Sequence, residues 1–301
     1  MTAITTAPAN AVLEAQPPPR GPTGAAKVLR QPLMVVGLTL LGILVLVAVF
    51  APLIATYDPT KVTGLVVEGP SARHWLGTDN PGRDLFSQLV YGSRVSLTVA
   101  LVAGSAAMAG AILVGVLPAL VGGAADRASN RMVVFLLALP GFPLLILVGS
   151  LAGNSRLAIV LTVSFLGIAP NARLLRSQAL SLRERGFISA ARGFGGGPLY
   201  VVRRHMVPGL GPLIMVGFVN MASLAIALEA SLAFLGIGDP SGISWGMMLN
   251  RALSDTSVYF STRWVTSVLP TGLAITLAVL GFAFVGVALE PAFNPRWLRS
   301  S

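Results

Sequence analysis

Long apolar stretches alternate with short polar ones along most of the chain. A helix needs about 20 apolar residues to cross a bilayer. Six stretches approach that length, and they lie approximately at 33–56, 95–121, 132–153, 157–176, 209–235 and 265–289. The fourth is the weakest because Arg173 and Arg176 interrupt it, although both side chains can reach the interface if the helix ends there. The pattern therefore predicts an all-α membrane protein with six transmembrane helices.

The segments around these stretches indicate how the chain is divided. The first stretch follows basic residues, as a secretory signal does, but a signal core has only roughly 7–15 apolar residues, so we expect an uncleaved first helix. The preceding "AQPPPRGPTG" is rich in proline and glycine and predicts a disordered tail. We expect a cytosolic tail, a first transmembrane helix, an external loop with an interfacial helix, a five-helix core and a second cytosolic tail, at 1–32, 33–56, 57–94, 95–291 and 292–301.

Composition agrees with a membrane protein and excludes several kinds of chemistry. The 301 residues are 54% hydrophobic and 11% charged, whereas a soluble domain carries about 25% charged residues. The net charge of +10 could indicate nucleic-acid binding, but only 7% of residues are aromatic and the basic ones flank apolar runs, so we expect no nucleic-acid partner. With no cysteine, and with His74 and His205 far apart, the sequence excludes disulfides, thiolate metal sites and cysteine nucleophiles, and we expect no metal site.

The distribution of Lys and Arg predicts the orientation. If the N-terminus is inside, the cytosolic segments carry 14 basic residues and the external ones carry seven. Cytosolic segments of membrane proteins carry the excess of Lys and Arg. We therefore expect both termini and the loop 177–208 in the cytosol.

The loop 177–208 contains an unusual run, "FISAARGFGGGPLYVVRRHMVP". The residues before "GGGP" can form a short helix, the glycines and proline must break it, and "LYVVRRHMVP" can begin a second helix that stops before Pro208. Ala190, Ala191 and Gly195 would then lie on an exposed elbow, where small side chains let another backbone approach. An arginine-rich loop that merely obeys the positive-inside rule is the alternative, and the spacing leaves both interpretations open.

The external segment contains turn chemistry before an amphipathic stretch. "TDNPG" is typical of a turn, and the next apolar residues fall on one helical face, which predicts a short interfacial helix before the second span. Asp79, Arg83 and Asp84 can tie the turn and cap this helix. We favour that structural role over direct contact with a substrate.

A few polar side chains fall within the predicted spans. Glu229 is the main ionisable one, and we favour structural pairing over a direct role in transport. Asn171, Asn220 and Ser223 could line a wet path or hydrogen-bond between helices, and both interpretations stay open. The prolines of "ALPGFP" predict a kink in the third span.

Three motifs resemble one known family. "SAARGFGGGPLYVVRRHMVP" resembles the EAA loop of ABC-importer permeases, the coupling helix that fits a groove on a cytosolic ATPase, and its "RHMVP" resembles the "RHILP" ending of peptide-importer permeases. Ser189 stands where that family often has Glu, so any contact made by that carboxylate is lost or replaced here. The resemblance implies an ATPase-coupling role for Ser189, Ala190, Ala191, Arg192, Gly195, His205 and Pro208.

The other two motifs narrow the resemblance. "HWLGTDNPGRDLFSQLVYGSRVSL" and "EASLAFLGIGDPSGISWGMML" are similar to signatures of the C-type permease of oligopeptide, dipeptide and nickel importers. Together the three motifs extend from about residue 74 to residue 249, and we identify no match in residues 1–32. The first of these two motifs contains the external set Gly77, Thr78, Asp79, Gly82, Arg83 and Asp84.

The resemblance implies a type I ABC importer permease fold in the plasma (inner) membrane of a prokaryote. The implied partners are two ATPase subunits or domains that hold ATP and Mg²⁺, a second B-type permease chain and an external substrate-binding protein. This chain itself is expected to bind no cofactor and to catalyse no reaction. Its two lysines are each followed by Val, so a GxxxxGK[ST] phosphate loop is excluded.

The predicted function is that of a permease subunit of an ATP-driven importer, with di- or oligopeptides as the expected cargo. Nickel chelates and glutathione-like solutes are alternatives within the same family. A secondary transporter driven by an ion gradient is the alternative from another functional class. Such a transporter needs an ion site within the membrane, and Glu229 alone is weak evidence for one.

Overall fold

The computed structural model describes residues 29–153, 155–239 and 242–290. The expected tail 292–301, and the tail 1–32 except for residues 29–32, lie outside these residues. Five of the described helices are long and apolar enough to cross a membrane, and a bent pair makes a sixth span if it is counted as one. The prediction of six spans is confirmed in this sense.

Two long rods form the centre of the bundle, and each is assembled from several helical pieces. The first covers Leu85–Val121 and the second Pro198–Phe234, each 37 residues long. The pieces of the first rod are α4 (Leu85–Ala111), a π-helical turn η1 (Ile112–Val116) and α5 (Leu117–Val121). The pieces of the second are α10 (Pro198–Val201), a π-helical turn η2 (Val202–Met206) and α11 (Val207–Phe234).

Each π turn lies just before a proline, which explains how the rods continue. Pro118 and Pro208 each follow a π turn by two residues. A proline has no N–H and its ring crowds the carbonyl four residues back, so it normally ends or kinks a helix. A π turn widens the helix, as when the N–H of Val207 donates to the carbonyl of Val202. The prediction that the second elbow helix stops before Pro208 is therefore wrong.

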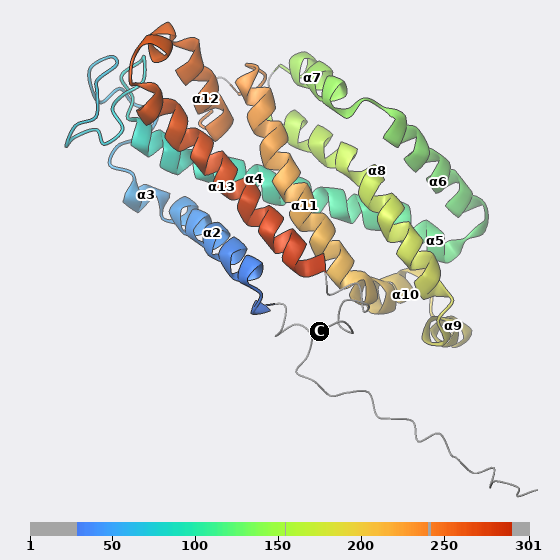
Figure 1. Ribbon diagram of the computed structural model, residues 1–301. Helices are drawn as coiled ribbons and strands as arrows, with labels where there is room; N and C mark the ends of the chain where they lie inside the picture. The colour runs from blue at the N-terminus through green and yellow to red at the C-terminus, as the bar shows by residue number, and fades with distance from the viewer. Residues whose placement is uncertain (1–28, 154, 240–241, 291–301) are drawn as a thin grey trace, which may run out of the picture.

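The other spans surround these rods (Figure 1). The first span is α2, continued by the short α3, and α13 packs beside it. On the other side α8 packs against α4, and α6 and α7 cover α8. The bounds are α2 (Pro32–Val49), α3 (Ala51–Ile54), α6 (Gly123–Ala138), α7 (Gly141–Leu151), α8 (Arg156–Arg183), α9 (Gly186–Gly193), α12 (Trp245–Ser254), the 3-10 helix η3 (Thr256–Phe260) and α13 (Trp264–Leu289).

Several predicted boundaries are corrected by the structure. The expected interfacial helix before residue 95 is not separate, because α4 begins at Leu85 and runs on without a break. The helix of the fourth span does not end at Arg176, because α8 continues to Arg183. Within this helix, Arg176 forms a bidentate ion pair with Asp126 of α6, at 2.7 and 2.8 Å.

The third span is broken rather than gently kinked. Its two halves, α6 and α7, are bent by 83° where Leu139 and Pro140 leave the helix. The kink expected from the prolines is thus present, but α6 begins at Gly123 rather than near residue 132. Its first turns, "GAADRASNR", are polar but contain good helix formers, so a search for apolar runs misses them.

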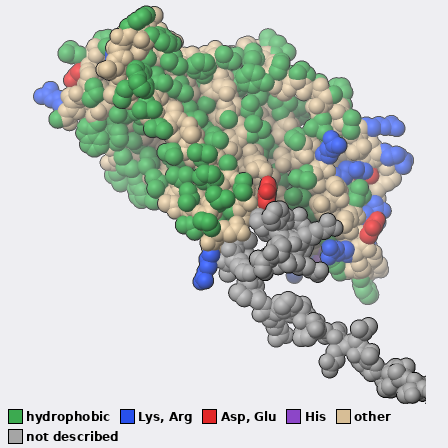
Figure 2. Space-filling view, viewed as in Figure 1, with side chains coloured by type: hydrophobic (Ala, Val, Ile, Leu, Met, Phe, Trp, Pro, Cys, Tyr) green, Lys and Arg blue, Asp and Glu red, His purple; other side chains and the backbone are tan. Residues whose placement is uncertain are grey.

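The bundle has two distinct ends. The beginning of α2, the end of α13, and α9 and α10 lie at one end, whereas α7, α12 and residues 57–84 lie at the other (Figure 1). We call these the elbow end and the α12 end. Figure 2 shows apolar side chains over the middle of the molecule and most Lys and Arg side chains gathered toward the elbow end.

Candidate functional site

The elbow, residues 186–206, begins with a helix that is closed by glycines. The N–H of Gly196 donates to the carbonyl of Ala191 at 2.9 Å, and the N–H of Gly195 donates to that of Arg192 at 3.0 Å. These two bonds form a Schellman motif, which requires a left-handed residue after the helix. Gly195 supplies it with φ +87°. The spacing of four residues from Ala191 to Gly195 is therefore the spacing of a helix C-cap.

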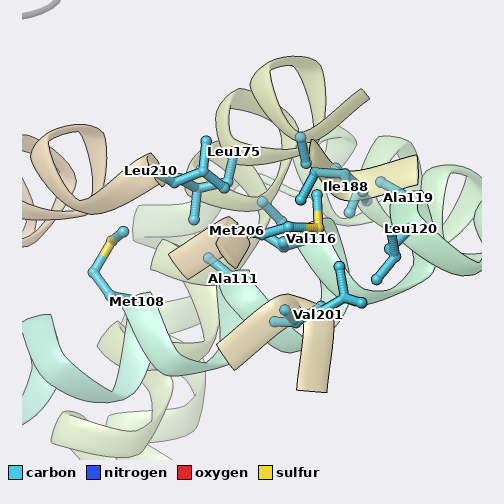
Figure 3. Close-up of a cluster of buried hydrophobic side chains, with 14 of the residues drawn as sticks. Met108, Ala111, Val116, Ala119, Leu120, Leu175, Ile188, Val201, Met206 and Leu210 are labelled. Carbon is cyan, nitrogen blue, oxygen red and sulfur yellow. The ribbon is translucent and has the colours of Figure 1, made fainter. Parts of the chain in front are cut away.

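One side chain anchors α9 to the bundle. Ile188 is fully buried in a cluster that includes Leu120 of α5 and Val201 and Met206 of the second rod (Figure 3). The rest of the helix is more accessible to solvent. A displacement of α9 must therefore move the ends of both rods, because close-packed side chains transmit strain rather than absorb it.

The accessible face of the elbow is apolar with a basic surround. Phe194 is 92% exposed, and Phe187, Leu199 and Tyr200 are also exposed. His205 lies between two of these rings, with its centroid 6.2 Å from Phe187 and 5.8 Å from that of Tyr200. Ser189, Ala190, Arg192 and Pro208 are exposed, and Ala191 and His205 are half-buried. Several exposed apolar side chains on one loop are typical of a protein-docking surface.

A second site lies between α7, α8 and α11 and is open to the surface, because several of its lining residues are exposed. It is a chamber of about 410 Å³ with mainly apolar walls, and it brings together Asn171 and Asn220 from different helices. The Asn171 amide donates to the carbonyl of Gly167 one turn earlier, at 2.8 Å. Asn220 is exposed. Two residues from the predicted polar set therefore share one chamber.

The other two residues of that set lie elsewhere. The Ser223 hydroxyl donates to the carbonyl of Val279 in α13 at 3.2 Å, so it links two helices. Glu229 is buried and lies 3.5 Å from the hydroxyl of Ser96 in α4, close to Ser244. Glu229 therefore has polar neighbours from two other segments of this chain, and its role in structural pairing stays a prediction.

The external motif forms a network of side-chain and backbone contacts at the α12 end. Asp84 is the N-cap of α4 and accepts from the N–H of Ser87 at 2.7 Å. Asp79 accepts from both the backbone N–H and the Nε of Arg83, at 2.7 and 3.0 Å. Thr78 accepts from the N–H of Glu68 at 2.8 Å. The predicted roles of tying the turn and capping the helix are confirmed.

Two members of this end were missed by sequence reasoning. Nδ1 of His74 lies 2.9 Å from the Asp84 carboxylate, and both side chains are buried. The indole of Trp245 donates to the carbonyl of Leu89 at 3.0 Å and covers Gly92 so closely that a Cβ there would lie 2.9 Å from the ring. His74 and Trp245 each lie within one of the two permease-like motifs, and no other feature of the sequence indicates their contacts.

Two positions of the external motif require glycine because of their backbone conformation. Gly77 and Gly82 have φ values of +80° and +85°, where other residues are strained. A Cβ on Gly77 would lie 2.3 Å from the carbonyl oxygen of Glu68, and one on Gly82 would lie 2.7 Å from that of Gly64. The two glycines of this motif are thus explained by close packing against residues 64–68 of the external loop.

Comparisons with known proteins agree with this architecture. The family model for the binding-protein-dependent transport system inner membrane component matches residues 111–299, and the model for the N-terminal TM domain of oligopeptide transport permease C matches residues 26–67. The second match extends into residues 26–32, where sequence reading identified no motif.

Individual relatives are similar over most of the chain. A Brucella suis protein that is provisionally named a peptide permease is 36% identical over 263 residues, covering 86% of each chain. The dipeptide transport system permease protein of Alkalihalophilus pseudofirmus is 34% identical and covers 88% of this chain and 86% of its own. The glutathione transport system permease protein of Pectobacterium atrosepticum is 34% identical, with 89% and 88% covered.

Proposed function

We propose a function from one premise: the chain belongs to the family of binding-protein-dependent transport system inner membrane components. It is a multi-pass protein of the bacterial inner membrane and acts as the permease subunit of an ATP-driven importer. Peptides are the cargo class, which is supported by relatives named for dipeptide transport and for the transport of glutathione, a modified tripeptide. Nickel chelates remain the alternative cargo.

The elbow carries this proposal, because it combines an exposed apolar face with one buried anchor. In the assembled importer α9 contacts a separate ATPase, which holds ATP and Mg²⁺ and supplies the energy. Phe194 and its apolar neighbours are the contact surface, and Ile188 transmits the displacement of α9 to the ends of both rods. The rods then tilt, and the chamber between α8 and α11 opens alternately toward the two sides of the membrane.

The chamber supports a role as one half of a pathway. Asn220 is exposed in the middle of a membrane-spanning helix. An amide in contact with hydrocarbon lacks hydrogen-bond partners, which is costly. The amide oxygen lies beside Gly286 of α13, and the exposed part of the side chain therefore faces water or another protein in the membrane. A second permease chain on this face would complete the pathway for a substrate delivered by an external binding protein.

Single-cysteine variants test the docking surface and the orientation, because the natural chain has no cysteine. In the purified complex, Ala190→Cys should cross-link to an ATPase, whereas Leu65→Cys, exposed at the α12 end, should not. In intact cells a membrane-impermeant maleimide should label only Leu65→Cys, because we place the elbow and both termini in the cytosol. Labelling of Ala190→Cys from outside would overturn that orientation.

Pull-down from the native membrane in mild detergent tests the assembly. An ATPase and a second permease at near-equal amounts are expected, and uptake of labelled dipeptides should then require all of them. A chain that purifies alone, under conditions that preserve other membrane complexes, would favour a secondary transporter. In that case Glu229→Gln should abolish uptake that depends on an ion gradient. If the complex forms but takes up nickel chelates instead of dipeptides, only the cargo assignment fails.

A further inference from the structure

A groove of about 1220 Å³ lies at the α12 end and shares no lining residue with the asparagine chamber. Residues 55–60, which follow the first span, form one side of it. Residues 91–102 of α4 form its floor, and the beginning of α8 with residues 242–243 forms the other side. The proposed function uses none of these surfaces.

The groove changes in polarity along its length. Val99, Val102, Leu157 and Val160 form an apolar wall, while Tyr57, Tyr91, Arg94 and Arg156 belong to its polar part. The wall continues along the exposed side of the first rod, at Leu101 of α4 and Leu113 of η1. Tyr side chains and long basic ones are typical of the boundary between hydrocarbon and water. The groove therefore crosses that boundary.

Arg94 is the unmatched charge in this groove. Asp58 is paired with Lys61 at 3.6 Å, and Asp239 with Arg156 at 3.4 Å. Arg94 is exposed and lies 5.8 Å from the Tyr91 ring, and among the described residues it has no carboxylate within ion-pair distance. A guanidinium at this level is suited to a phosphate, which it can bind through two parallel hydrogen bonds.

We propose that the groove binds a membrane phospholipid, with its phosphate at Arg94 and an acyl chain along Val102 and Leu157. This inference rests on the chain crossing a membrane and not on the nature of the cargo. The lipid fills the space between the first span and α8, and so holds residues 55–60 against α4. A transmembrane helix of another subunit would leave the Arg94 charge facing an apolar surface, which is why lipid is favoured as the occupant.

Native mass spectrometry of the purified complex, released gently from detergent, tests this proposal. We expect about one retained phospholipid per permease chain, and an at least fivefold lower retention in Arg94→Gln. The matched control is Arg73→Gln, which removes an exposed arginine at the same end outside the groove and should leave retention unchanged. Equal retention in the wild type and Arg94→Gln would overturn the proposal.

A second variant separates lipid binding from a general effect of charge. Val102→Trp leaves Arg94 in place but fills the apolar wall, so it should also lower retention. Adding phosphatidylglycerol vesicles should restore the bound lipid in the delipidated wild type. Inorganic phosphate, at a concentration about 10-fold above that of the lipid, should not displace it. Competition by phosphate alone, or an efficient cross-link from Thr98→Cys to a second permease, would show that the groove has another occupant.

Discussion

The two ends of the molecule carry motifs that are equally recognisable in the sequence, but their residues are buried at one end and exposed at the other. At the α12 end, His74, Asp84 and Trp245 are buried and contact one another's elements. At the elbow end, Ser189, Ala190 and Arg192 are exposed, and their only structural requirement is the helix that displays them. The motif residues of the first end are buried within the chain, whereas those of the second are displayed on its surface.

The glycines of the two ends also differ in how much space surrounds them. A Cβ on Gly77 or on Gly246 of the α12 end would overlap backbone atoms at 2.3 and 2.6 Å. A Cβ on Gly193, Gly195 or Gly197 of the elbow would meet nothing within 4 Å. Gly196 is the exception in the elbow, because a Cβ there would lie 2.5 Å from the carbonyl oxygen of Ala191 in its own helix cap. The glycines of the α12 end thus pack against other segments of the chain, whereas most of those in the elbow face open space. Changes at the α12 end should therefore affect stability, and changes at the elbow should affect assembly.

The largest effect is expected from Asp84→Ala. The substitution removes the N-cap of α4, worth about 1 kcal/mol, and leaves His74 buried without its partner. Leaving a buried hydrogen-bonding group without its partner costs roughly 1–3 kcal/mol. The thermal midpoint of the purified chain in detergent should fall by many degrees. The control is Asp58→Ala, which removes an exposed carboxylate and should leave the midpoint unchanged. Equal midpoints for both variants would show that the buried pair adds no stability.

A pair of glycine variants tests the contrast next. Gly77→Ala combines a left-handed backbone with a Cβ overlap, and we expect it to destabilise the chain by about 2 kcal/mol. Gly197→Ala has an ordinary φ of −66° and open space, so the thermal midpoint should stay within error of the wild type. If Gly197→Ala were the more damaging change, the elbow would be packed more tightly than its exposure indicates.

The sequence predicted most of the spans because lipid leaves a backbone few choices. An apolar run of sufficient length has to satisfy its own hydrogen bonds, and a helix does so. The cap at Asp84 was also predictable, because turn residues stand directly before an amphipathic stretch. These inferences need only neighbours in the sequence.

The remaining features depend on partners that are distant in the sequence. The contact from Trp245 to the carbonyl of Leu89 joins residues 156 positions apart. The ion pair from Arg176 to Asp126 joins α8 to α6 across 50 positions. The continuation through Pro208 depends on a π turn, which is not evident from periodicity. Of the polar residues in the spans, the sequence could not tell which share the chamber, because that depends on how α8 and α11 are rotated.

An exposed aromatic at each end offers a test of smaller effect. Phe194 of the elbow is 92% exposed, and Phe260 of the α12 end is 91% exposed. Neither substitution to Ala should change stability. If the elbow is the docking surface, Phe194→Ala should weaken ATPase binding about 10-fold, near 1.4 kcal/mol, as expected for an aromatic anchor at an interface. Titration of ATPase into nanodisc-embedded permease measures this, and Phe260→Ala should bind normally. Equal binding by both variants would exclude Phe194 from the contact.

The smallest effect is expected where this chain departs from the family pattern. Ser189→Glu restores the usual carboxylate on an exposed position of α9, between Arg185 one turn before and Arg192 one turn after. Pairs at these spacings on a helix surface contribute about 0.2–0.5 kcal/mol, and salt screens them. The thermal midpoint should therefore change by a degree or two at most, and less at high salt. Ser189→Gln is the uncharged control. A larger change in ATPase affinity for Glu than for Gln would show that the carboxylate meets a basic group on the partner. Unchanged affinity in both would mean that Ser189 lies at the edge of the docking surface, and that α9 binds through its apolar face.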